Sequence, residues 1–289
     1  MHESVAFSQL IDYAGLFPPA TLAMEPAIAE YAALRTLPQA WMLGRFILPL
    51  SSLRAFCAAK GTQRFPVSLI LDGLDDEAAF AAAFARVASL GDSVNVEAFE
   101  IPVSCSISPE RLATLAERSN IGAMPIFCEV RLDESLPECL DRVHAAGLGA
   151  KVRCGGMVAT AYPSSEQLAR FLVEVARVGI AFKATAGLHH PICGVRDEHN
   201  GATMHGFLNM LVGATLARRG GRMESIISIL ESQDASAFAY DGHTLRFSTE
   251  TISQSELRDV RSGAFTSYGS CSFREPLTDL QTLGMVESA

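Results

Sequence analysis

Eight short apolar segments recur along the chain, each bounded by turn residues and separated by stretches with helical spacing. Alternating strand and helix patterns predict a parallel sheet, and eight repeats predict that the sheet closes into a (β/α)₈ TIM barrel. An open doubly wound sheet is disfavoured, because no G-x-G-x-x-G follows the first segment. We therefore expect one barrel domain over residues 1–289. The expected strands are 9–16, 42–48, 67–72, 94–101, 126–132, 150–155, 181–187 and 265–273.

Helical patterns fill the connections in the middle of the chain. Ser108 precedes Pro109, which is the order of an N-cap followed by proline in the first turn. The expected helices are 75–88, 109–119, 136–146 and 165–178.

One connection, residues 188–264 between the seventh and eighth strands, is far longer than the others. Its pattern predicts helices over 204–219 and 223–231, then a hairpin over 237–247 around Asp241-Gly242. Long insertions in a compact domain are commonly lids or interfaces. In a barrel we expect this one to lie over the mouth, where the active site is found.

Side-chain alternation separates charged from apolar positions on three neighbouring strands. Glu129 and Arg131 on the fifth, Lys151 and Arg153 on the sixth, and Lys183 and Thr185 on the seventh lie opposite apolar residues. The apolar face must meet the helix layer, so these six side chains are predicted to point into the barrel, near its carboxyl end.

Polar positions on the first, second and fourth strands are less clearly assigned. Asp12 on the first strand could supply an acid or belong to a hydrogen-bonded barrel floor. Arg45 could reach the mouth from the second strand or form a salt bridge at the rim. Alternation on the fourth strand does not decide whether Glu97 or Glu100 points inward.

Lysine is scarce in this chain. Of 23 basic residues only three are lysine, Lys60, Lys151 and Lys183, and two of these are predicted on adjacent inward positions. Arginine serves as well in an ion pair, but only lysine can lose a proton and attack a carbonyl when a nearby cation and burial lower its pKa. The alternative is that each lysine pairs with Glu129, Asp72 or another acid and only supports the barrel.

Three motifs in the last third of the barrel resemble the deoxyribose-phosphate aldolase type of class I aldolase. The segment 151–155 (KVRCG) is similar to that family's K-x-x-x-G strand, and 183–187 (KATAG) to its K-A-S-G-G strand. The segment 268–272 (YGSCS) is similar to its F-G-x-S-S phosphate-binding turn. The three occur in the family's order.

The resemblance implies a catalytic role for the two lysines and a phosphate site beyond them. Lys151 would form the Schiff base, and Lys183 would lower its pKa. Gly187, Ser270 and Ser272 would bind a substrate phosphate through backbone and hydroxyl groups.

The resemblance also implies an acid on an earlier strand, for which Asp72 is the best match. The sequence departs from the family in three places. Arg153 and Cys154 replace small hydroxyl residues, His189-His190 stands where the family has a phosphate-gripping turn, and the insertion is longer.

The histidines after the seventh strand carry an alternative chemistry. His189, His190 and His205, with Glu129 or Glu100, could bind a metal or act as acid and base. The sequence contains no H-x-H or H-E-x-x-H pattern.

Two further features lie near the same predicted rim. Gly155-Gly156 offers backbone N–H groups for an anion, or forms a tight turn. Cys271 is a reactive thiol or, by the simpler interpretation, a small packed residue.

Composition narrows the partners. The net charge of −9 disfavours nucleic acid and leaves room for a small anionic substrate in a locally positive pocket. No uncharged apolar stretch reaches about 18 residues, so no membrane helix is predicted, and the first 16 residues do not read as a signal peptide. Seven scattered cysteines indicate reduced thiols and a cytoplasmic protein. A homo-oligomer is compatible with the sequence.

These observations favour a lyase of the class I aldolase type, working on a small anionic carbonyl substrate without a cofactor. Lys151 or Lys183 would form the imine, and His189, His190 or Asp72 would move protons. One alternative is a metal-assisted hydrolase or isomerase using His189 and His190. Another is a non-catalytic barrel that binds a ligand or a protein partner.

Overall fold

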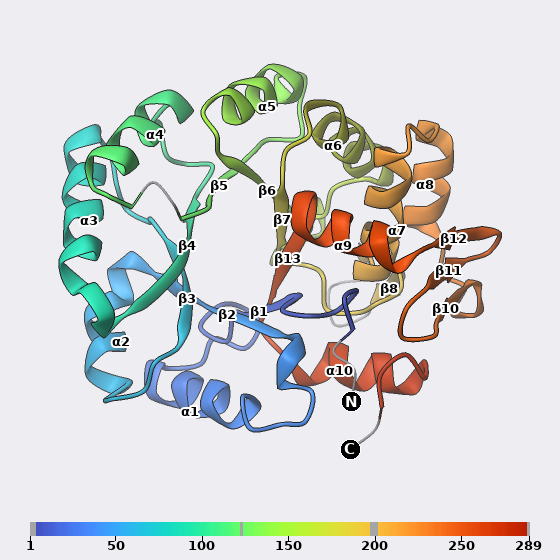
Figure 1. The fold of residues 1–289 in the computed structure, drawn as a ribbon, viewed down its shortest axis with the longest axis horizontal. Helices are drawn as coiled ribbons and strands as arrows, with labels where there is room; N and C mark the ends of the chain where they lie inside the picture. The colour runs from blue at the N-terminus through green and yellow to red at the C-terminus, as the bar shows by residue number, and fades with distance from the viewer. Residues whose placement is uncertain (1–3, 122–123, 197–201, 288–289) are drawn as a thin grey trace.

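A closed barrel of eight parallel strands forms the centre of the computed structural model, which describes residues 4–121, 124–196 and 202–287 (Figure 1). The strands follow the order β1-β13-β7-β6-β5-β4-β3-β2 around the barrel. The TIM-barrel prediction is confirmed, and each of the eight expected segments contains or overlaps a barrel strand. The strands are β1 (Ile11–Tyr13), β2 (Leu43–Pro49), β3 (Pro66–Ile70), β4 (Asn95–Ile101), β5 (Ile126–Glu129), β6 (Gly149–Arg153), β7 (Phe182–Thr185) and β13 (Phe265–Ser270).

An outer ring of helices surrounds the barrel (Figure 1). The helices are α1 (Met24–Leu34), α2 (Leu53–Ala59), α3 (Glu77–Leu90), α4 (Pro109–Arg118), α5 (Leu136–Ala145), α6 (Ser165–Val178), α7 (Phe207–Arg218), α8 (Met223–Glu231), α9 (Gln254–Gly263) and α10 (Arg274–Thr282). Ser108 caps α4 as expected, and its hydroxyl accepts from the Arg111 N–H. α9 was not expected, although Ser253 and Glu256 form a capping box at its start.

Aromatic packing joins the helix layer to the barrel. Phe182 of β7 meets Phe171 of α6 edge to face at 5.1 Å between ring centroids and stacks on Phe265 of β13 at 5.3 Å. On β7, Phe182 alternates with Lys183, whose side chain points the other way, into the barrel. Burying each ring contributes roughly 1.5–3 kcal/mol, so the apolar outer face fixes which side chains face inward.

The long connection does not cover the barrel mouth as one unit, so that expectation is wrong. It begins with a hairpin of β8 (Gly194–Arg196) and β9 (Ala202–Met204). α7 then packs against α6, α8 and β13 in the outer layer. A helix in this position returns the chain to the amino end of the barrel before the next parallel strand begins. The residues after α7 therefore start at the end opposite the mouth.

The expected hairpin at 237–247 is present and belongs to a three-stranded antiparallel sheet at the amino end. Its strands are β10 (Phe238–Tyr240), β11 (Leu245–Phe247) and β12 (Glu250–Ile252). Tyr240 hydrogen-bonds Ser4 at 2.5 Å and packs on Phe7 with ring centroids 5.1 Å apart. Ser4 and Phe7 lie in the segment that leads into β1, so this sheet packs against the amino-terminal segment, at the periphery of the molecule (Figure 1).

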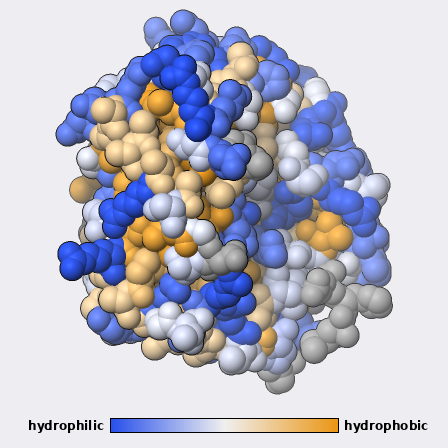
Figure 2. Space-filling view, turned by 60° about the vertical axis from the view of Figure 1, so that its left-hand side comes forward, coloured by the Kyte–Doolittle hydropathy of each residue, from blue (hydrophilic) through white to orange (hydrophobic). Residues whose placement is uncertain are grey.

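The face shown in Figure 2 mixes hydrophilic residues with weakly and strongly hydrophobic ones. On α3 the exposed positions include Ala78, Ala82 and Ala85, which accounts for small apolar side chains at the surface there. Among the described residues, no helix combines the length and apolar character needed to cross a bilayer.

Candidate active site

A cavity of about 440 Å³ opens at the carboxyl ends of the barrel strands. Its wall includes the last residues of four strands, Ile70, Glu129, Arg153 and Thr185, together with Lys151. This is the end at which TIM-barrel enzymes carry their active sites. Other polar groups in the wall are Gly156, Gly187, His189 and Cys271.

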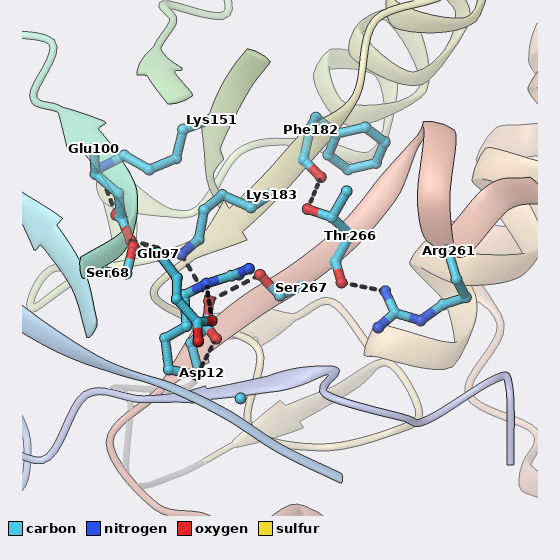
Figure 3. Close-up of polar contacts among 12 residues, drawn as sticks. Asp12, Ser68, Glu97, Glu100, Lys151, Phe182, Lys183, Arg261, Thr266 and Ser267 are labelled. Carbon is cyan, nitrogen blue, oxygen red and sulfur yellow. Dashed lines mark hydrogen bonds and ion pairs between the residues drawn. The ribbon is translucent and has the colours of Figure 1, made fainter. Parts of the chain in front are cut away.

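Lys183 lies below the cavity in a closed ionic cluster (Figure 3). Its Nζ is 2.7 Å from Asp12 Oδ2 and 2.6 Å from Glu100 Oε1, and all three side chains are at most 1% exposed. Ser267 donates to Asp12 at 2.8 Å, and Ser68 donates to Glu100 at 2.7 Å. Asp12 therefore belongs to the hydrogen-bonded barrel interior, one of its two expected roles.

Lys151 continues the same network toward the mouth. Its Nζ is 3.1 Å from Glu100 Oε2 and 3.0 Å from Glu129 Oε2. Arg153 donates from Nε to Glu129 Oε1 at 2.9 Å. Cations and anions thus alternate from Arg153 down to Asp12, three of each. The ion-pair alternative for both lysines is present in the structure, with Glu129 and Glu100 as partners of Lys151.

The pKa values of the buried members follow from this pairing. Burial alone would raise the pKa of Glu100, but Lys183 and Lys151 outweigh it and hold the pKa at about 2. Burial would likewise lower the pKa of Lys183, but Asp12 and Glu100 raise it. For Glu129, the attraction of Lys151 and Arg153 overcomes burial and lowers the pKa. Glu100, Glu129 and Lys183 are therefore charged at neutral pH.

The two lysines differ in their access to the cavity. Lys151 and Lys183 are register partners on β6 and β7, and both are almost completely buried. Yet Lys151 contributes to the cavity wall and Lys183 does not. Lys151 is therefore the amine placed to meet a molecule in the cavity.

An irregularity in β4 explains why alternation could not assign its two glutamates. Val67 pairs with Val96 and Ser68 with Ala98, so β4 has an extra residue at Glu97. Glu100 points into the barrel, while Glu97 lies near the amino end and pairs with Arg45 at 3.3 Å. Arg45 thus forms a salt bridge away from the cavity and does not reach the mouth.

Asp72 is not part of the lysine network. Its carboxylate accepts from the Ser51 N–H at 3.1 Å and from the Ser51 hydroxyl at 2.6 Å. The carboxylates that contact the lysines are Asp12, Glu100 and Glu129.

His189 enters the cavity wall with a carboxylate behind it. Its Nδ1 is 3.0 Å from Glu275 Oε2 and 4.0 Å from Cys271 Sγ. Burial would lower the pKa of His189, but hydrogen bonds to Cys271 and Glu275 raise it to about 9. The imidazole is therefore protonated at neutral pH and can donate a proton into the cavity. Glu275 was missed at the sequence level, because it lies on α10, 86 residues away.

The other two histidines lie outside the cavity wall. His190 Nδ1 is 2.7 Å from Asp279 Oδ2 on α10. His205 Nε2 bonds the Pro163 carbonyl at 2.8 Å, and burial lowers its pKa. His205 therefore joins the segment before α6 to the segment before α7.

Of the groups expected to bind an anion, some line the cavity and others do not. Ser270 donates to the Ser272 carbonyl at 2.6 Å, the Ser272 hydroxyl accepts from the Glu275 N–H at 3.2 Å, and neither serine lines the cavity. Gly187 and Gly156 do line it.

The glycines at the ends of β6 and β7 allow two loops to approach closely. Gly187 has φ +68°, and a Cβ there would lie 2.5 Å from the Cys154 carbonyl oxygen. A Cβ on Gly155 would lie 2.8 Å from Gly187 Cα. Close backbone packing therefore accounts for both Gly155 and Gly187.

Metal ligands are not assembled in the part of the chain that the structure describes: no group of three or more His, Cys, Asp or Glu side chains there could hold a metal ion. Comparison with models of known families and with curated protein sequences gives no match.

Proposed function

We propose that this barrel is a lyase of the class I aldolase type, in which Lys151 forms an imine with a small carbonyl substrate. The observation that carries the proposal is the position of Lys151 in the cavity wall, bracketed by two carboxylates that can exchange protons with it. The order of motifs on β6, β7 and β13, similar to the deoxyribose-phosphate aldolase type, supports the same chemistry.

Glu129 is the proton acceptor best placed to prepare the amine. Lys151 transfers a proton to Glu129, 3.0 Å away, and the neutral amine attacks the carbonyl carbon. The carbonyl oxygen takes up two protons that originate from the ammonium and leaves as water. The products are one iminium ion and one water, so atoms and charge balance.

The iminium then acts as the electron sink for the carbon–carbon step. Glu129, which has given its proton to the departing water, takes a proton from the adjacent carbon, and the resulting enamine uses its electron pair to form the new bond to an acceptor aldehyde. The protonated His189 can supply the proton that the acceptor's oxygen takes up. Lys183 is sealed below the cavity and holds Glu100 and Asp12 in place.

The metal-assisted alternative gains no specific support from the geometry. His189 and His190 direct their Nδ1 atoms to two different carboxylates of α10, Glu275 and Asp279. The other alternative is a non-catalytic barrel that binds a ligand. The following test distinguishes it from an aldolase.

The test is inactivation by borohydride in the presence of carbonyl compounds. The protein is incubated with small aldehydes, ketones and 2-oxo acids, reduced, and assayed for carbon–carbon bond formation or cleavage. Imine chemistry predicts inactivation only when carbonyl compound and borohydride are both present, with no activity in Lys151→Arg. Activity in Lys151→Arg equal to that of the wild type, or turnover abolished by chelator alone, would refute the proposal.

A further inference from the structure

Cationic side chains outnumber carboxylates among the residues that line the cavity, and one of them is an arginine with unused donors. Lys151, Arg153 and His189 line the cavity with one carboxylate, Glu129, while Glu100 and Glu275 bond Lys151 and His189 from behind the wall. Arg153 is the half-exposed cation of the three, and an exposed cation at the mouth attracts an anion even though the whole chain carries a net charge of −9.

Arg153 uses only a part of its hydrogen-bonding capacity. Nε donates to Glu129 Oε1 at 2.9 Å, and within residues 4–121, 124–196 and 202–287 the guanidinium makes no other hydrogen bond. Its side chain is 50% exposed, so the two terminal nitrogens are accessible at the mouth. The terminal edge of a guanidinium matches the two oxygens of a carboxylate in a bidentate pair.

The distance along β6 between the Lys151 amine and the Arg153 guanidinium limits the size of a molecule that can contact both. Lys151 and Arg153 are two residues apart on the inward face of β6, which corresponds to a rise of about 7 Å. Glu129 lies between them and bonds both. A molecule whose carbonyl carbon meets Lys151 would therefore bring a carboxylate one or two carbons away within reach of Arg153.

The turn after β13 is poorly suited to a phosphate dianion. The Ser270 hydroxyl is committed within the turn, and Ser272 binds the first turn of α10. The carboxylates of Glu275 and Asp279 lie on that helix beside the histidines, where they would repel a dianion. The wall also includes the apolar side chains of Phe17, Ile47 and Met157, which suit a short hydrocarbon chain.

We infer that Arg153 is a specificity-determining residue and that the substrate is a short-chain oxo carboxylate, not a sugar phosphate. This inference rests on the proposed imine at Lys151. Arg153 binds the carboxylate through its terminal nitrogens, while the hydrocarbon part lies against the apolar wall.

The first experiment measures how much adduct borohydride traps at Lys151 as the concentration of each carbonyl compound rises. The three probes are 2-oxobutanoate, the neutral butanone and dihydroxyacetone phosphate. We expect Arg153→Met to raise the half-saturating concentration of 2-oxobutanoate at least tenfold and to change that of butanone less than twofold. Arg153→Lys should fall between, because it keeps the charge and loses the fork. Arg131→Met, at an exposed arginine on the same rim outside this cavity, is the matched control and should behave as the wild type.

Trapping of dihydroxyacetone phosphate at lower concentration than 2-oxobutanoate, unaffected by Arg153→Met, would overturn the inference and leave the imine proposal standing. A second measurement does not need an imine: ligand-observed NMR of butanoate binding to the unreacted protein. Binding that is lost in Arg153→Met and kept in Arg131→Met supports the carboxylate site even where no adduct forms at Lys151. Butanoate binding equal in wild type and Arg153→Met, or undetectable in both, contradicts it.

Discussion

The two inward lysines show how one residue type serves two purposes on neighbouring strands. Lys183 is fully buried, contacts two carboxylates at 2.6 and 2.7 Å, and is cut off from the cavity. Lys151 contacts its carboxylates at 3.0 and 3.1 Å and forms part of the cavity wall. Lys183 lies deeper in the barrel than Lys151, and only Lys151 can contact a substrate in the cavity. Lys183 should therefore matter most for stability, and Lys151 for chemistry.

The largest expected effect on stability is that of Lys183→Met. Removing this ammonium leaves Asp12 and Glu100 charged inside the barrel, and breaking a buried ion pair costs about 3–5 kcal/mol. Urea denaturation measures the loss. Lys60→Met is the control, because within the described part of the chain the Lys60 ammonium donates to the backbone carbonyls of Gly61 and Gln63 and not to a carboxylate. The double variant Asp12→Asn/Lys183→Met should recover part of the loss; no recovery, with Lys183→Met as stable as Lys60→Met, would contradict the assignment.

The acid dependence of stability should come next in size. The pKa of Glu100 in the folded protein, about 2, lies below its value in the unfolded chain, so the unfolded state binds more protons between about pH 4.5 and 2. The stabilisation by Glu100 is present above that window and lost as the pH falls through it, on the order of 3 kcal/mol in total.

Comparing wild type with Glu100→Gln isolates this contribution. The free energy of unfolding, measured by urea denaturation from pH 6 downwards, should fall more steeply in the wild type. The exposed Glu117→Gln variant should follow the wild-type curve. Parallel curves for wild type and Glu100→Gln would show that Glu100 is not held ionised by the lysines.

Lys151→Met should cost less stability than Lys183→Met and remove the chemistry completely. Glu100 keeps Lys183 and Glu129 keeps Arg153, so neither carboxylate loses every cationic partner, and the expected loss is about 1–3 kcal/mol. Urea denaturation and borohydride trapping on the same preparation give both numbers. A Lys151→Met variant that loses as much stability as Lys183→Met would erase the distinction between the two lysines.

The smallest effect on stability is expected for Glu275→Gln, because this carboxylate is 38% exposed and its ion pair with His189 is screened by solvent. Glu275→Gln removes a carboxylate from Nδ1, so the pKa of His189 should fall from about 9 toward the ordinary value of about 6.5. Since the folded pKa is raised, the stabilisation is fully present below about pH 6.5 and lost as the pH rises through 9. NMR titration of the imidazole measures the shift, and Asp279→Asn, which removes the carboxylate bonded to His190 Nδ1, should leave it unchanged. An equal shift of the His189 pKa in both variants would show that Glu275 is not the group that raises it.

The sequence pattern predicted the barrel because each strand could be recognised from its own residues alone. The apolar positions that pack outward on β6 and β7 also fixed which charged residues face inward. The extra residue in β4 broke the period of two, so neither Glu97 nor Glu100 could be assigned in advance. The placement of 188–264 over the mouth failed because length alone does not say at which end of the barrel a segment emerges.

The partners of the lysines depend on closure of the barrel. Asp12 and Lys183 are 171 residues apart, and only the pairing of β1 with β13 and of β13 with β7 brings them together. Glu275 reaches His189 from a helix beyond the last strand. A sequence pattern can propose such residues one by one, but it does not state which of them meet.

The most direct test of the account is the position of a single trapped adduct. The wild-type protein is treated with a small aldehyde and borohydride under native conditions, and the modified lysines are mapped by mass spectrometry. The account predicts modification at Lys151, with Lys183 protected until the protein unfolds. Modification of Lys183 before Lys151, or no modification of Lys151 until the protein unfolds, would contradict the assignment of Lys151 as the reacting amine.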